Sequence, residues 1–283
     1  MSANARTFSL HRFASLEFIL GAVLLVTIIG TVLLSQWLFV DPAKISLSTR
    51  LIPPWQDPAH PFGTDALGRD ILSRVASGGW ISLKVGFISV AGSVVLGVGM
   101  GLVAGYYRGI WDVIVMRLAD VQLALPFILL AITFVAIVGG SLTNTIILLI
   151  VSQWVQYARL VRASVLSLRE REFVLSARAI GVKNRHIILR HILPNLLGPV
   201  VVLMTLNVAN NILLESSLTF LGLGVDPTIP SWGGMLAEGR TYLQTAWWIS
   251  VMPGMAILLT VLGLNLLGDW LRDLLDPTGR TNR

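Results

Sequence analysis

Polar side chains recur at regular spacing inside one of the apolar parts of this sequence. Asn207, Asn211 and Glu215 follow one another at steps of four, so they share one face if the segment is helical. Groups on such a face, which we call the polar stripe, can hydrogen-bond neighbouring helices or line a water-filled pathway shared with a partner subunit. The residues leave both alternatives open, and the lined pathway is the candidate site.

Charged side chains also gather in the segment 41–84, which is rich in proline near its start. Asp65, Arg69 and Asp70 can pair with one another or receive a second protein from outside. Trp232 lies near the end of another apolar stretch, where tryptophan is common at a membrane interface. Docking of a partner protein, or a role as a gate for the substrate, is the alternative for Trp232.

The sequence lacks the motifs of enzymes that could work in such an apolar setting. It has no cysteine and no HExxH, so thiolate chemistry and a zinc-protease site are excluded. None of the three lysines is followed by Ser or Thr, so there is no GxxxxGK[ST] phosphate loop. We therefore expect no enzyme activity and no bound metal or nucleotide in this chain, and any nucleotide energy must come from another chain.

The elements that position these residues are membrane spans. Hydrophobic residues make up 54% of the 283 residues and charged residues only 13%, against about 25% charged in soluble domains. Six uncharged stretches approach the roughly 20 residues that a helix needs to cross a bilayer. They are 18–39, 85–107, 121–138, 142–158, 196–214 and 246–268.

The positive charges predict the orientation of these spans. Of the 21 Lys and Arg residues, 15 fall on the side that holds both termini, so both termini are predicted to be cytoplasmic. This distribution explains the net charge of +6 without nucleic-acid binding. The first stretch is longer than the apolar part of a signal peptide, and no small-x-small site follows it, so we expect it to stay attached.

The predicted organisation has four parts. Residues 1–40 form a cytoplasmic N-terminus and first span, 41–84 a periplasmic loop, 85–277 the membrane core, and 278–283 a tail. The core contains a long inward loop, 159–195, whose segment 164–181 is predicted to be a helix ending at Gly181. A second amphipathic piece leads into the fifth span, and Gly97, Gly101 and Gly105 predict close helix contact in the second span.

The inward loop carries the first specific resemblance. Residues 175–195, LSARAIGVKNRHIILRHILPN, resemble the EAA loop of ABC importer permeases, with matches at Ala177, Gly181 and the Leu193-Pro194 pair. Leu175 and Ser176 replace the usual Glu and Ala, and Glu172 lies three residues earlier than the Glu of the motif. Position 191 also departs from the motif, with His in place of the usual Ile.

The resemblance implies that this loop forms a coupling helix that docks in a groove of an ATPase subunit. Among its basic residues, Arg178 is the best candidate for an interface contact, and the others also suit cytoplasmic membrane flanks. The coupling residues implied by the match are Glu172, Ser176, Ala177, Arg178, Ala179, Gly181, Leu193 and Pro194.

Five further stretches are similar to the dipeptide, oligopeptide and nickel branch of these permeases, to the type usually named C. The similarity runs from about residue 41 to residue 277. The stretches are 62–74 (FGTDALGRDILSR), 116–126 (MRLADVQLALP), 218–224 (LTFLGLG), 230–236 (PSWGGML) and 265–277 (NLLGDWLRDLLDP).

The family resemblance implies an all-α integral membrane protein with six transmembrane helices, the MetI-like transmembrane domain of a type I ABC importer. It implies a bacterial plasma-membrane complex with a homologous B-type permease, two ATPase subunits that bind ATP and Mg, and a periplasmic or lipid-anchored solute-binding protein. The expected function is ATP-driven uptake of di- or oligopeptides. Nickel chelates, glutathione and other small solutes are alternatives.

A different class, a self-sufficient channel or secondary carrier, is the main rival. Such a protein needs ionisable groups at mid-membrane or an inverted internal repeat, and the sequence shows neither. A membrane enzyme is disfavoured because the spans lack histidines and central carboxylates.

Overall fold

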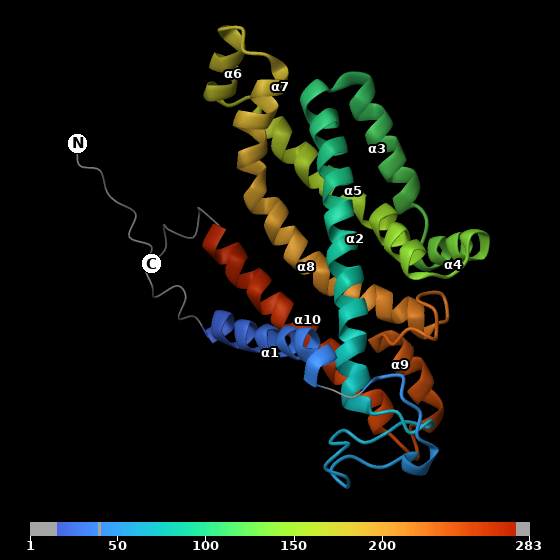
Figure 1. Ribbon diagram of the computed structural model, residues 1–283. Helices are drawn as coiled ribbons and strands as arrows, with labels where there is room; N and C mark the ends of the chain where they lie inside the picture. Colours follow the sequence, from blue (N-terminus) through green and yellow to red (C-terminus); the bar gives the residue numbers. More distant parts are fainter. Residues whose placement is uncertain (1–15, 39–40, 276–283) are drawn as a thin grey trace, which may run out of the picture.

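A computed structural model describes residues 16–38 and 41–275, and every regular element in these two ranges is a helix (Figure 1). This confirms the predicted all-α class. In chain order the elements are α1 (Leu16–Leu38), η2 (Leu47–Thr49), α2 (Ile71–Tyr107), α3 (Gly109–Leu123), α4 (Phe127–Val138), α5 (Leu142–Leu168), α6 (Glu172–Ala179), α7 (Asn184–Ile187), η3 (Ile188–Ile192), α8 (Leu193–Phe220), α9 (Trp232–Gly239), η4 (Arg240–Tyr242) and α10 (Trp248–Leu275).

Five helical segments in the described ranges are long and apolar enough to cross a membrane: α1, α2, α5, the continuous stretch from α7 to α8, and α10. They contain or overlap the predicted spans 18–39, 85–107, 142–158, 196–214 and 246–268. The helices extend beyond several of these predictions. In particular, α2 begins at Ile71, so the last part of the predicted outer loop 41–84 is helical.

The third predicted span, 121–138, is not one straight helix. Instead, α3 and α4 meet at a bend of 91° and form a sixth candidate span only as a broken pair. The chain leaves the helical conformation at Pro126 (φ −57°, ψ 133°), which has no N–H to continue the helix. Gln122 fastens the end of α3 to α5, since it donates to Ser152 O (2.9 Å) and accepts from Trp154 Nε1 (2.6 Å).

Helices α2 and α5 touch along the predicted glycine face. A Cβ carbon added at Gly101 would lie 2.6 Å from Ala158 O, and one added at Gly105 would lie 2.8 Å from Val165 Cβ. A side chain at Gly97 would likewise meet the α5 backbone. The prediction of close packing in the second span is confirmed.

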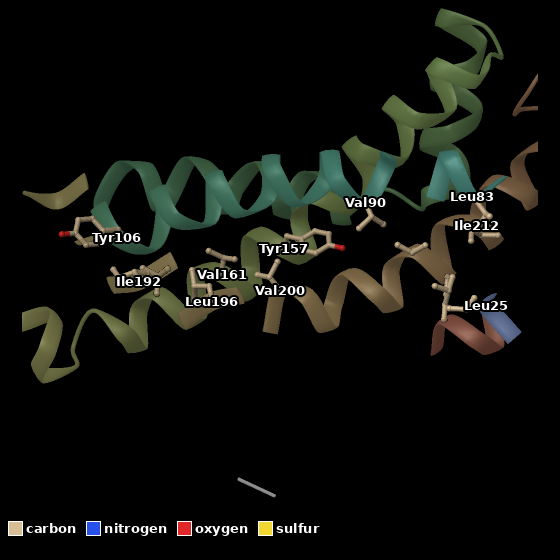
Figure 2. Packing of buried hydrophobic residues seen from close by; sticks show 14 of the residues in the cluster. Leu25, Leu83, Val90, Tyr106, Tyr157, Val161, Ile192, Leu196, Val200 and Ile212 are labelled. Carbon is tan, nitrogen blue, oxygen red and sulfur yellow. The ribbon is translucent and has the colours of Figure 1, made fainter. Parts of the chain in front are cut away.

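The long helix α2 runs from one end of the molecule to the other. Helices α6 and α7 lie at its C-terminal end, whereas segment 41–70 and α9 lie at the opposite end (Figure 1). Between these ends, a buried apolar cluster joins α2, α5 and α8, with Val161, Leu196 and Val200 facing one another (Figure 2). This core connects the inward loop to the membrane spans.

Candidate functional site

The inward loop is folded back on the end of the bundle as two short helices. The predicted single helix over 164–181 is wrong, because α5 ends at Leu168 and α6 begins at Glu172. Arg171, in an extended conformation, separates them. The break turns Val174 and Ala177 inward, where both side chains join the main apolar cluster.

Gly181 ends the first helix in the way that its sequence position indicates. The N–H of Val182 donates to Ala177 O, and the N–H of Gly181 donates to Arg178 O, each at a distance of 3.0 Å. These two bonds form a Schellman motif, which requires a left-handed residue, and Gly181 has φ +80°. The predicted helix–Gly–helix shape is confirmed.

Pro194 explains an irregularity where the loop enters the membrane span. Proline cannot donate to the carbonyl four residues earlier and its ring clashes with that group. The chain responds with a π-helix, η3, in which Leu193 N–H bonds Ile188 O five residues back. Asn195 Nδ2 also donates to His191 O (2.7 Å). A π turn of this kind frequently marks a functional site inside a helix.

Most of the predicted coupling residues are accessible from outside the bundle. Ala177 is buried and Leu193 is half-buried, whereas the exposed members are Glu172, Ser176, Arg178, Ala179, Gly181 and Pro194. Apolar side chains accompany them, since Phe173, Leu175 and Ile180 are exposed and Ile180 is 81% exposed. A short helix with exposed apolar and charged residues beside one another is suited to docking on another protein.

The polar stripe lies inside the bundle. Asn211 is fully buried and donates to Ser89 Oγ of α2 (2.7 Å), while Asn207 donates to Tyr157 Oη of α5 (2.9 Å). In this conformation the stripe makes the interhelical contacts that the sequence left as one alternative. A place for these residues on the transport pathway stays a prediction.

Glu215, the last residue of the stripe, is fully buried at the contact of α8 with α2. Its carboxyl oxygens accept from Ser82 Oγ (2.9 Å) and Thr219 Oγ1 (3.0 Å), and Ser216 Oγ lies 3.4 Å away. Three hydroxyl groups therefore replace water around this carboxyl group. The sequence analysis missed Ser82 because it lies 133 residues from Glu215 in the chain.

At the opposite end, four charged side chains form what we call the outer network: Asp65, Arg69, Arg74 and Glu238. Asp65 Oδ2 accepts from Arg69 Nε and from Arg74 Nη1, each at a distance of 2.6 Å. Arg74 also binds both carboxyl oxygens of Glu238 (2.7 and 2.9 Å), and Arg69 reaches Glu238 at 2.9 Å. The network joins the outer segment and α2 to α9, and the sequence analysis missed Arg74 and Glu238.

The other predicted docking residues are occupied within the chain. Asp70 caps α2 by accepting from Ser73 N (2.7 Å), and its second oxygen lies 3.0 Å from His60 Nδ1. Trp232 is 1% exposed and donates to Val75 O (2.8 Å). The Trp232 ring is therefore packed within the chain, and of the predicted docking set only Arg69 keeps appreciable exposure.

The described ranges contain no group of three or more His, Asp or Glu side chains placed to hold a metal ion. Two ion pairs join α3 to α5. Arg159 and Arg162 of α5 pair with Asp120 and Asp112 of α3, respectively.

Comparison with known proteins gives a consistent family. The family model described as "Binding-protein-dependent transport system inner membrane component" matches residues 97–280. The chain is 47% identical over 235 residues to the dipeptide transport system permease protein DppC of Alkalihalophilus pseudofirmus, covering 83% of this chain and 77% of that one.

Two other relatives have similar identity. The chain is 41% identical to the di/tripeptide transport system permease protein DppC of Pseudomonas aeruginosa, covering 91% of this chain and 86% of that one. It is 46% identical to the glutathione transport system permease protein GsiD of Escherichia coli, covering 77% and 72%.

Solved structures support the same fold. The chain is similar to a chain of the inward-facing MetNI methionine ABC transporter, with a TM-score of 0.56 and 20% identity, over 71% of this chain and 96% of that one. An amino acid ABC transporter gives the same TM-score at 12% identity, covering 71% and 94%.

Proposed function

This chain belongs to the family of binding-protein-dependent transport inner membrane components, and we propose that it forms, with a homologous B-type permease, the pathway for ATP-driven uptake of di- or oligopeptides. It is a multi-pass permease subunit of an ABC transporter of the inner membrane. The observation that carries the proposal is the exposed helix α6, which the Gly181 turn joins to α7, where a continuous helical segment begins that includes the span α8.

The geometry supports a route from an ATPase subunit to the membrane. Docking on α6 would apply movement to a short element that the Schellman motif and the buried side chains of Val174 and Ala177 hold in place. Residues 184–220 form one continuous helical segment, so a displacement of the loop would tilt α8. ATP and Mg would be bound by two partner ATPase subunits, and nucleotide would bias two arrangements of the bundle.

The substrate proposal rests on the relatives. Their names specify dipeptides, di- and tripeptides, and glutathione, which is itself a tripeptide. Short peptides are thus favoured over nickel chelates. A periplasmic or lipid-anchored solute-binding protein would deliver the peptide to the outer end, and both termini would face the cytoplasm, as the distribution of Lys and Arg indicates.

Copurification tests this composition. The tagged chain is extracted from native membranes in mild detergent, and all copurifying polypeptides are identified. We expect a homologous permease and ATPase subunits with phosphate loops, and deletion of residues 172–183 should abolish capture of the ATPases but not of the permease. A chain that copurifies alone, or only with copies of itself, would favour the self-sufficient carrier.

A further inference from the structure

Tyr106, next to the last residue of α2, lies where the inward loop meets the bundle. Its side chain is 5% exposed and joins the same apolar cluster as Ala177 and Ile187. Figure 2 shows Tyr106 beside Ile192, with its hydroxyl group directed away from the core. The ring is therefore fixed while the hydroxyl group is free to bind a polar partner.

That partner belongs to the inward loop. Tyr106 Oη donates to Asn184 Oδ1 at a distance of 2.8 Å. Asn184 is the first residue of α7, which follows the Gly181 turn. The two residues are 78 positions apart in the chain. This bond connects the end of α2 to the turn between the two helices of the loop.

Two arginines complete the contact. The guanidinium carbon of Arg178, on α6, lies 5.7 Å from the centre of the Tyr106 ring, which is cation–π geometry. Arg169, at the end of α5, donates from Nη1 to the Tyr106 carbonyl oxygen at a distance of 3.0 Å. Tyr106 therefore contacts the end of α5, the helix α6 and the start of α7.

These contacts have a mechanical consequence. The loop is covalently continuous with α5 and α8, but α2 reaches it only through space. At the same time α2 and α5 are in close contact along Gly97, Gly101 and Gly105. A movement of α6 and α7 that reaches Tyr106 is thus passed to the α2–α5 pair as well as to α8.

We propose that Tyr106 is a positioning residue for transport, which links the docking helix α6 and the turn after Gly181 to α2. Movement imposed by an ATPase would then displace α2 together with α5 and α8. This inference rests on the proposed function, in which α6 receives that movement. Without the Tyr106–Asn184 bond, the loop would still pull α5 and α8 through the chain, while α2 would follow the loop less closely. ATP would then be hydrolysed with less uptake.

The test uses the full complex of both permeases, the ATPases and the binding protein in proteoliposomes. Uptake of labelled dialanine and ATP hydrolysis are measured together, and their ratio is the readout. Tyr106→Phe removes only the hydroxyl group, and Asn184→Ala removes its acceptor. Asn184 is exposed, so water can bind its amide in Tyr106→Phe, and loss of its side chain in Asn184→Ala opens the Tyr106 hydroxyl group to water. Both variants should fold.

We expect each variant to lower uptake per ATP by about fivefold, the factor that one hydrogen bond commonly contributes. The double variant should be no worse than either single variant, because both remove the same bond. Tyr107→Phe is the matched control: Tyr107 is the next residue, half-exposed, with its ring edge-on to Tyr106, and it should keep the wild-type ratio.

A wild-type ratio in both Tyr106→Phe and Asn184→Ala would overturn the inference, as would full additivity in the double variant. The failure of the proposed function looks different. In that case the wild-type complex itself would show no uptake of dialanine coupled to ATP, whatever residue stands at position 106.

Discussion

Gly101 on α2 lies so close to Ala158 on α5 that a Cβ carbon at Gly101 would come within 2.6 Å of the Ala158 carbonyl oxygen and 2.9 Å of Val161 Cβ. Both neighbours are parts of a regular helix and cannot rotate away. The contact between these two residues therefore sets the separation of α2 and α5, the pair that runs through the centre of the bundle.

The first prediction follows from this distance. Gly101→Ala should destabilise the folded chain by about 1–3 kcal/mol, the usual cost of forcing an extra carbon into a close contact. Gly99→Ala is the control, because a Cβ carbon at Gly99 meets nothing within 4 Å. Thermal unfolding of the purified variants in detergent measures the difference, and equal melting temperatures would contradict the account.

The outer network gives the second prediction. Arg74 and Asp65 are each about 3% exposed, so removal of Arg74 takes one of two arginine partners from a buried carboxylate and removes the hydrogen bonds of Glu238 to α2. Breaking such a pair commonly costs about 3–5 kcal/mol. Arg74→Ala should therefore loosen the outer segment, and limited proteolysis of residues 41–70 would detect it.

Arg240→Ala serves as the control for the outer network, since Arg240 is exposed and lies just after α9. Its proteolysis pattern should match the wild type. If Arg74→Ala is cleaved no faster than Arg240→Ala, then the network does not hold the outer segment to α9.

The sequence predicted local features more successfully than contacts between distant segments. The Gly181 turn and the Gly101 face are confirmed because each depends on backbone conformation or volume at a single residue. The hydropathy of the span 121–138 does not show the break that occurs at Pro126. Arg74 and Glu238 were missed because they are 164 residues apart, and no spacing rule relates them.

The polar stripe shows the same limit in another form. Its spacing predicted a shared helix face but not what that face meets. The structure places Asn211 against Ser89 of α2, a partner that depends on how two helices cross. Both alternatives had been left open for this reason.

The third prediction concerns that contact. If Asn211 and Ser89 stabilise the bundle by their hydrogen bond, then Asn211→Leu and Ser89→Ala should be non-additive in a double-mutant cycle. Hydrogen bonds between membrane helices contribute about 0.6 kcal/mol on average. Unfolding of the four proteins in a denaturing detergent gives the coupling energy. Strict additivity would show that the bond contributes nothing.

The fourth prediction concerns the inward turn. Gly181 has φ +80°, whereas proline requires φ near −65°, and Gly181→Pro also removes the N–H that binds Arg178 O. The turn lies outside the spans, so insertion and pairing with the second permease should persist. ATP hydrolysis should become uncoupled from uptake.

Gly181→Ala provides a graded comparison, because a left-handed alanine costs only roughly 1–2 kcal/mol and a Cβ carbon there meets nothing within 4 Å. Uptake per ATP should fall less than in Gly181→Pro. Normal coupled uptake in Gly181→Pro would count against the assignment of this loop to coupling.

Cross-linking from α6 in native membranes tests the central claim most directly. The sequence has no cysteine, so Ser176→Cys, on the exposed face of α6, introduces a single thiol for a short thiol–amine reagent. Thr241→Cys, exposed at the opposite end of the molecule, is the matched control. We predict a cross-link from Ser176→Cys to an ATPase subunit and none from Thr241→Cys. Absence of an ATPase adduct from Ser176→Cys, in membranes where the thiol is shown to react, would contradict the account.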